Sequence, residues 1–173
     1  CSAYFVRDEV ALQKTFALTP EYLKTLHDEN VVNFRDWGIQ LGRRFRALKL
    51  WFVLRSFGVE GLQAKLRDHI AFANSFRMWV EESNLFELMA PVPLGLVCFR
   101  YNPQSSETPL GEDEIDSINE RLLTNLNSSG KIHLTHTRLN GKYVLRFCVG
   151  QLWTKRADVE DAWQLIVEKA EAL

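Results

Sequence analysis

The sequence has little cysteine and no long apolar run. Its three cysteines, Cys1, Cys98 and Cys148, are odd in number and widely spaced, which argues against a disulfide framework. Cys98 and Cys148 lie in apolar, strand-like segments where a buried free thiol is expected, so we predict a reducing, cytoplasmic compartment. No Cys or His cluster has the spacing of a metal site, and no apolar run approaches the roughly 18 residues that span a bilayer. We therefore expect neither a metal nor a membrane partner.

The chain also lacks an excess of either charge. Its 21 Lys and Arg residues and 22 Asp and Glu residues give a net charge of −1. A general polyanion binder normally carries a clear basic excess, so we expect no nucleic-acid partner. A hydrophobic fraction of 46% over 173 residues suits a globular protein with a real core, as one domain or as one domain plus a piece of another.

The first 34 residues show little regular patterning. The sequence opens with Cys1-Ser2-Ala3-Tyr4-Phe5-Val6, without Met and without a signal-peptide pattern. We predict a short strand over residues 1–6 and expect a chain cut inside a fold. Residues 15–34 are polar, contain a Thr19-Pro20 turn, and are long for a structureless connection, which predicts a functional or mobile segment.

The rest of the chain alternates between helical and strand-like periods. We predict a helix over 43–57 that ends at Gly58 and is packed on more than one side, because residues 50–54 are all apolar. Further helices are expected at about 60–82, around 115–126, and from about Val159. Strands are expected at 86–89, 94–100, 132–138 and 142–149, the last two joined by an Asn140-Gly141 hairpin turn. This pattern predicts an α+β fold, a small antiparallel sheet with helices on one face.

One segment resembles a known signature. Residues 35–51, RDWGIQLGRRFRALKLW, are similar to a signature of the group II pyridoxal-phosphate (PLP) decarboxylases, which include aromatic-L-amino-acid, tyrosine and histidine decarboxylases. The similarity continues through residues 55–58, 61–63, 94–100, 131–134 and 144–147, and it covers essentially the whole chain. The Arg43-Arg44-Phe45-Arg46 stretch is its most specific part.

The resemblance implies a fold type I architecture, with a large cofactor-binding domain and a small carboxy-terminal domain in an obligate homodimer. Residues 1–42 would be the tail of the large domain, including a mobile catalytic loop, and residues 43–173 the small domain. The His-Lys-Trp motif that holds the family's Schiff-base lysine does not occur in this sequence, and Lys14, Lys24 and Lys49 do not match it. The resemblance thus implies PLP as cofactor, no cofactor-binding residue in this chain, the upstream large domain as partner, and no activity for the chain alone.

Tyr22 is the first candidate catalytic residue. Decarboxylation needs an electron sink, which the PLP ring supplies, and an acid on a closing loop can then deliver a proton to Cα. Tyr22 matches the family's loop tyrosine, which is thought to supply that proton. Relatives that make aldehydes rather than amines can lack this tyrosine, so its presence favours simple decarboxylation. The alternative is a surface tyrosine packed on a loop.

Gly42 and Arg146 are candidate substrate-binding residues. The aromatic-amino-acid enzymes resemble this chain in having Gly at position 42, where the histidine enzymes tend to have Ser, so Gly42 would leave room for a larger substrate ring. The alternative is a helix-start glycine. Arg146 lies in a strand that corresponds to one where fold type I enzymes often hold the substrate carboxylate with an arginine. The alternative is a structural ion pair.

The remaining charged and ionisable residues have structural interpretations. We interpret the basic cluster of Arg35, Arg43, Arg44, Arg46 and Lys49 mainly as ion pairs that join the two domains and the dimer partner. His27 lies near Tyr22 and could assist it, whereas His69 is expected to be structural. His133 and His136 are three residues apart on a strand and should point to opposite faces, which excludes an undistorted two-ligand metal pair.

The sequence therefore predicts the carboxy-terminal portion of a decarboxylase that converts an aromatic L-amino acid to its amine and CO2. Two alternatives remain open. The first is a decarboxylase for histidine, glutamate or diaminobutyrate. The second is a non-catalytic dimerisation or interaction module.

Overall fold

The computed structural model describes residues 4–17, 32–40, 42, 44–103 and 110–173. It divides into two compact units, Cys1–Gly58 and Val59–Leu173, which are treated separately below. The unit boundary after Gly58 differs from the predicted domain boundary between residues 42 and 43, which stays a prediction.

The first unit is built around a short helix that the sequence pattern did not predict. Helix α1 (Glu9–Phe16) begins at Asp8, whose side chain accepts a hydrogen bond from the Ala11 amide at 2.9 Å. A 3-10 turn, η3 (Phe34–Trp37), follows, and its end rings meet edge to face at 5.7 Å. The strand predicted over 1–6 was wrong for residues 4–6, which are exposed and in no strand, because a strand needs a partner to complete its hydrogen bonds.

Helix α2 (Ala47–Glu82) contains both of the long helices expected from the sequence. Gly58, at φ 66° and ψ 173°, interrupts the helical backbone, and glycine tolerates this conformation because it has no Cβ. The predicted helix end at Gly58 is thus confirmed. The expectation that the preceding helix is packed on more than one side was wrong for this chain, since residues 47–56 are all exposed.

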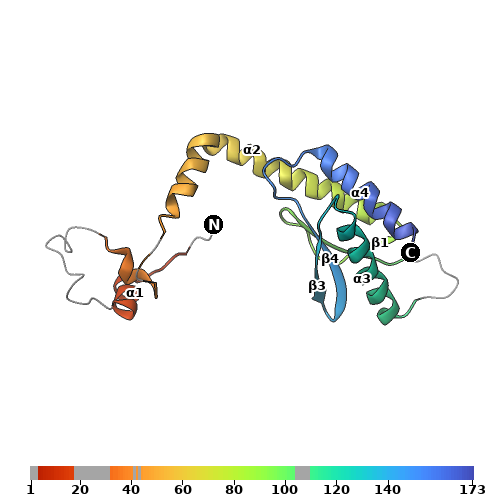
Figure 1. The fold of residues 1–173 in the computed structure, drawn as a ribbon, viewed down its shortest axis with the longest axis horizontal. Helices are drawn as coiled ribbons and strands as arrows, with labels where there is room; N and C mark the ends of the chain where they lie inside the picture. The colour runs from red at the N-terminus through yellow and green to blue at the C-terminus, as the bar shows by residue number, and fades with distance from the viewer. Residues whose placement is uncertain (1–3, 18–31, 41, 43, 104–109) are drawn as a thin grey trace. The chain divides into compact units, whose positions relative to one another are not determined.

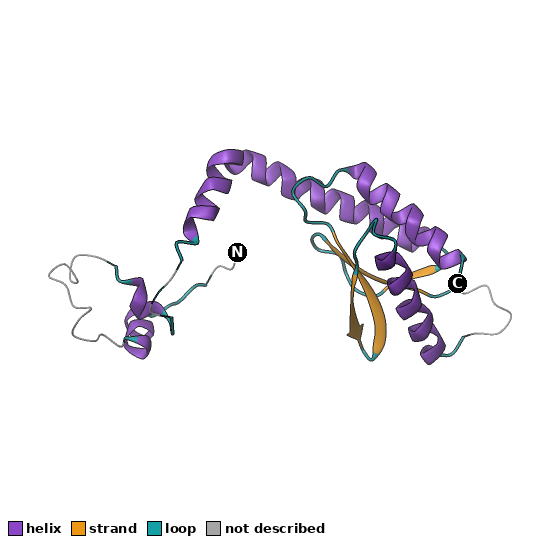
Figure 2. Ribbon diagram, in the orientation of Figure 1, coloured by secondary structure: helices purple, strands orange, loops and turns teal. Residues whose placement is uncertain are grey.

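The second unit is an α+β layer, as predicted. Four strands, β1 (Phe86–Leu88), β2 (Leu96–Tyr101), β3 (Thr135–Leu139) and β4 (Lys142–Cys148), pair antiparallel in the order β1-β2-β4-β3. Helix α3 (Glu112–Ser128) and helix α4 (Arg156–Glu171) complete the unit with the second half of α2 (Figures 1 and 2). Asn140 and Gly141 both have positive φ, 51° and 83°, which confirms the predicted hairpin turn.

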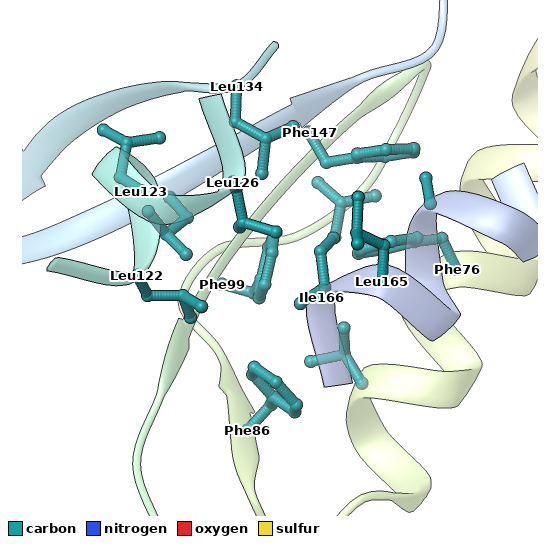
Figure 3. Close-up of a cluster of buried hydrophobic side chains, with 14 of the residues drawn as sticks. Phe76, Phe86, Phe99, Leu122, Leu123, Leu126, Leu134, Phe147, Leu165 and Ile166 are labelled. Atoms are coloured by element: carbon teal, nitrogen blue, oxygen red, sulfur yellow. The ribbon is translucent and has the colours of Figure 1, made fainter. Parts of the chain in front are cut away.

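The core of this unit lies between one face of the sheet and the three helices. Odd-numbered residues of β2 and β4 point to this face, including Phe99 and Phe147. Phe76 of α2 is fully buried against them, stacked on Phe147 with ring centroids 4.1 Å apart and edge to face with Phe99 at 5.3 Å (Figure 3). Trp163 of α4 contacts the same ring at 5.3 Å. Aromatic packing thus joins α2 and α4 to the sheet.

Helix α3 is attached to the sheet by polar side chains that bond to strand backbone. Asn119 is fully buried and makes two hydrogen bonds with the Tyr101 backbone, accepting from its N–H and donating to its C=O, both at 2.8 Å. Asn127 bonds in the same way to the N–H (2.8 Å) and C=O (3.0 Å) of Leu134. Asp116 accepts from the Tyr143 amide at 2.7 Å. These bonds satisfy backbone groups that the strand ladder leaves unpaired, which would otherwise be costly to bury.

Gly95→Ala is expected to destabilise the second unit. A Cβ at Gly95 would lie 2.5 Å from the Val149 carbonyl oxygen, and the two backbones are held together by a 2.7 Å bond from the Val149 N–H to the Gly95 C=O. Relief of this clash requires the strands to separate, which we expect to cost about 1–3 kcal/mol, as for overpacking in a core. Urea unfolding of the chain measures this loss.

Gly150→Ala is the matched control for that experiment. Gly150 is exposed, and the nearest atom to an added Cβ is the Cys148 Sγ at 4.0 Å. An unfolding midpoint that moves equally in both variants would contradict the close-approach explanation.

No helix in the described part of the chain is both long and apolar enough to cross a membrane.

Candidate functional site

The predicted site residues fall in different parts of the chain. Tyr22 and His27 lie outside the described residues. Gly42 lies in the first unit, and a Cβ there would meet no heavy atom of the described residues within 4 Å. Arg146 lies in the second unit, on β4. Each remains a predicted site residue.

Arg146 is half-buried between two neighbouring strands. Its Cα partners are Cys98 on β2 and Thr135 on β3, and its Nη1 donates to the Thr135 hydroxyl at 3.5 Å. Burial raises the pKa of the Cys98 thiol, and Arg146 partly offsets this shift. Among the described residues no carboxylate forms an ion pair with Arg146 within 4.0 Å. The guanidinium of Arg146 is therefore not held in a structural ion pair within this part of the chain. Arg146 also lines a hollow of about 610 Å³.

A buried arginine, Arg100, joins four elements of the second unit. Its side chain is 2% exposed and donates from Nε to Glu87 on β1 and from Nη1 to Glu112, the first residue of α3, at 2.7 Å. Glu112 also accepts from Lys142 Nζ on β4 at 2.8 Å. Burial lowers the pKa of Arg100, but the hydrogen bonds to Glu112 and Glu87 outweigh it and leave the pKa above its usual value. The arginine therefore stays charged and fully paired in the interior.

The same network predicts an acid-sensitive step in stability. Hydrogen bonds from Arg100 and Lys142 lower the pKa of Glu112 to about 2 from 4.5. Because the folded-state pKa lies below the unfolded one, this stabilisation is complete above about pH 4.5 and is lost as the pH falls toward 2. The free energy of unfolding, measured by urea titration at successive pH values, should fall across that window. Glu112→Gln should flatten this part of the profile, and an unchanged profile in that variant would rule Glu112 out as the cause.

The basic cluster is only partly accounted for by ion pairs. Arg35 pairs with Asp36 at 3.7 Å within η3, whereas Arg44, Arg46 and Lys49 are exposed. Arg43 lies outside the described residues. The role of this cluster in joining domains stays a prediction.

The surroundings of the described histidines suit a structural role. His69 is buried on the core side of α2, and its Nε2 has no hydrogen-bond partner among the described residues. His136 stacks on Tyr143 with ring centroids 4.7 Å apart and planes at 8°, while His133 lines the hollow beside Arg146. No group of three or more potential ligands that could hold a metal ion occurs within the described residues.

The described residues do not fit a covalently held aldehyde cofactor. Such a cofactor needs a lysine enclosed beside its ring. Lys142 pairs with Glu112 and Lys169 with Glu168. The exposed lysines of the described residues are Lys14, Lys49, Lys131 and Lys155, and Lys65 is half-buried on α2.

The fold is an α+β layer, a four-stranded antiparallel sheet with helices. The conserved domain of pyridoxal-dependent decarboxylases matches residues 1–102, and the chain belongs to this family, whose members use PLP. It is 43% identical over 175 aligned residues to tyrosine decarboxylase 4 of Petroselinum crispum and 41% identical to tryptophan decarboxylase TDC1 of Camptotheca acuminata. In both cases the match covers 100% of this chain and 34% of the relative.

The solved structures agree with this assignment. The crystal structure of Oryza sativa TDC with PLP and tryptamine superimposes with a TM-score of 0.89 at 36% identity, over 96% of this chain and 34% of that one. The chain thus spans about a third of the length of the curated relatives it matches, and it corresponds to the carboxy-terminal portion of these enzymes.

Proposed function

We propose that this chain is the carboxy-terminal portion of a PLP-dependent decarboxylase that converts an aromatic L-amino acid to its amine and CO2. The observation that carries the proposal is the similarity over the whole chain to relatives named for two aromatic substrates, tryptophan and tyrosine. A solved relative was crystallised with tryptamine, an aromatic amine.

In this proposal three residues of the chain contribute to the active site. Tyr22 delivers the proton to the substrate Cα after CO2 leaves, and its presence favours the amine over an aldehyde product. Gly42 leaves space for the aromatic ring, which is supported by the finding that no heavy atom of the described residues lies within 4 Å of an added Cβ. Arg146 contacts the substrate carboxylate, which is supported by the lack of a described carboxylate partner. The Schiff-base lysine would lie outside these 173 residues, so the chain alone would be inactive.

The exposed apolar surface of α2 supports the proposed partners. Leu50, Trp51, Phe52, Val53 and Leu54 are between 42% and 56% exposed. A patch of this kind normally marks an interface. We propose that the large domain of the same protein and a second copy of the protein cover it, in a cytoplasmic homodimer.

The experiment that tests the proposal is CO2 release by the complete protein with PLP, across a panel of L-amino acids. Turnover of tryptophan, tyrosine, Dopa or phenylalanine supports the proposal and the open position at Gly42. Turnover confined to histidine, glutamate or diaminobutyrate would keep the family and contradict the aromatic substrate. Cofactor binding without any decarboxylation would favour a non-catalytic interaction module.

A further inference from the structure

The tight turn that joins β3 to β4 (Figure 1) consists of Asn140 and Gly141, and both residues are exposed. The pair of the ladder nearest to the turn is Leu139 with Lys142, so the two turn residues lie outside the strand pairing. Among the described residues, neither the Asn140 side chain nor the Gly141 N–H takes part in a hydrogen bond. The side-chain amide and the next backbone nitrogen are therefore not held apart by other partners.

The space around these two groups is also open. A Cβ added at Gly141 would meet no heavy atom of the described residues within 4 Å. Because glycine has no side chain, nothing on residue 141 shields its backbone nitrogen, and its backbone rotates more freely than that of any other residue. Rotation about the Cα–C bond of Asn140 brings its side-chain Cγ against the Gly141 nitrogen, where the two atoms can close a five-membered ring.

A cation lies beside the same turn. Arg138 donates from Nη1 to the Gly141 carbonyl at 2.7 Å, and the same nitrogen pairs with Asp116 of α3 at 2.7 Å. A nearby positive charge favours the deprotonated form of a neighbouring group. The guanidinium therefore favours loss of the proton from the backbone amide between Asn140 and Gly141, and the deprotonated nitrogen is the stronger nucleophile.

We propose that Asn140 is a site of spontaneous covalent modification, at which asparagine is converted to aspartate and isoaspartate. The Gly141 nitrogen attacks Cγ of Asn140, so that a bond from this nitrogen to Cγ forms and the bond from Cγ to Nδ2 breaks. The leaving nitrogen takes up the proton of the Gly141 amide and departs as ammonia. The attack is favoured because both groups are held on adjacent residues.

Water completes the reaction by opening the five-membered succinimide ring at either of its carbonyls. Addition to the side-chain carbonyl gives aspartate, and addition to the backbone carbonyl gives isoaspartate, in which the main chain runs through Cγ. The overall change replaces an amide by a carboxylate and consumes only water. The proposal does not depend on the decarboxylase function, because it requires no cofactor and no residue outside the second unit.

The two products should differ in their effect on the hairpin. Aspartate keeps the turn, since Asp-Gly is accepted in a type I′ turn as Asn-Gly is. Isoaspartate adds one carbon to the main chain of a two-residue turn, and the length of the turn fixes the register of the strands that it joins. Isoaspartate at residue 140 should therefore weaken the pairing of Leu139 with Lys142.

Other asparagines of the second unit lack this combination of features. Asn119 is fully buried and bonded to strand backbone, and the Asn127 side chain is bonded to Leu134. Asn125 is exposed like Asn140, but it lies within α3 and is followed by the branched Leu126. Asn125 is therefore an internal control that differs from Asn140 in its neighbour and in its backbone.

The test follows both asparagines in one sample. The 173-residue chain is kept in mildly alkaline buffer and digested at intervals, and mass spectrometry measures the share of each peptide in which an amide has become an acid. We expect the Asn140 peptide to convert at least about tenfold faster than the Asn125 peptide, because only the former has an unshielded nitrogen outside regular structure. Equal rates for the two peptides, or slower conversion at Asn140, would overturn the proposal.

A variant then assigns the isoaspartate to this turn. Isoaspartate in the whole chain is measured by methyl transfer with an isoaspartyl methyltransferase. Asn140→Gly removes the reacting amide and keeps the turn, because Gly-Gly also accepts positive φ at both positions. Methyl incorporation into the aged variant should fall to the level of the fresh chain. Incorporation equal to that of the aged, unchanged chain would place the reaction elsewhere and contradict the assignment.

Asn140→Asp separates the added charge from the added carbon. Its urea unfolding midpoint should match that of the fresh chain, whereas the aged chain, which contains isoaspartate, should unfold at a lower urea concentration. An equal loss in Asn140→Asp and in the aged chain would contradict the effect ascribed to the lengthened turn.

Discussion

Arg100→Met is expected to lower the free energy of unfolding by about 3 kcal/mol. The substitution retains an apolar stem of similar length but leaves Glu87 and Glu112 without the buried cation that joins them. Removing one partner of a buried ion pair costs about 3–5 kcal/mol. Because the Glu87 and Glu112 carboxylates are partly exposed to water, we expect a loss at the lower end of this range. Urea unfolding of the chain, followed by circular dichroism, measures this loss.

Arg121→Met on the outer side of α3 is the control, since it removes the same charge from an exposed position. We expect a change within about 0.5 kcal/mol for it, as for most surface substitutions. If Arg100→Met were as stable as Arg121→Met, Arg100 would not hold β1, β2 and α3 together.

Tyr22→Phe should lower amine formation by the complete enzyme about 10²- to 10⁴-fold. This is the range that a positioned general acid contributes, and the substitution removes only the hydroxyl that is proposed to protonate the substrate. Amine and aldehyde products are separated by chromatography and compared with the CO2 released. In air-equilibrated buffer we expect the share of aldehyde to rise as the amine falls, with O2 as the oxidant and with ammonia and H2O2 released beside the aldehyde.

Tyr4→Phe provides a matched control, because Tyr4 lies in the same part of the chain, is 80% exposed and is not a predicted site residue. It should leave the rate of amine formation unchanged. Equal rates in Tyr22→Phe and the unchanged enzyme would remove Tyr22 from the proposed chemistry.

Local signals predicted several elements on both sides of the unit boundary. The Asn140-Gly141 turn and the helix end at Gly58 require positive φ, which glycine adopts freely and asparagine tolerates. Apolar residues at steps of three or four marked the buried stripe of α2 that includes Ala73, Phe76 and Val80. These features depend on neighbours in sequence, and they were confirmed.

Features that depend on distant neighbours could not be predicted in the same way. The Arg100 network connects residues 12 to 30 positions apart, and nothing in the local pattern of β2 distinguishes a buried, paired arginine from an exposed one. Asn127 likewise resembles an ordinary polar helix residue in the sequence, although its side chain bonds to both backbone groups of Leu134, the residue before β3. Helix α1 is different, because the sequence does carry local signals for it. Its Asp8 cap and its basic last turn at Lys14 are typical of a helix, although no helix was predicted there.

The predicted site residues came from the resemblance rather than from periodicity. Gly42 and Arg146 lie in separate units of this chain, and Tyr22 lies outside the described residues, so their common site remains part of the proposal. The exposed apolar residues of α2 illustrate the same limit of a single chain. An apolar helix predicts burial, but among the described residues positions 47–56 are all exposed.

The most direct test of the central claim is the product balance of the complete protein, supplied with PLP and either L-tryptophan or L-tyrosine. We expect one mole of tryptamine or tyramine for each mole of CO2 released. Release of CO2 with aldehyde in place of amine would contradict the proposed role of Tyr22, and the absence of CO2 from both substrates would contradict an aromatic-amino-acid decarboxylase.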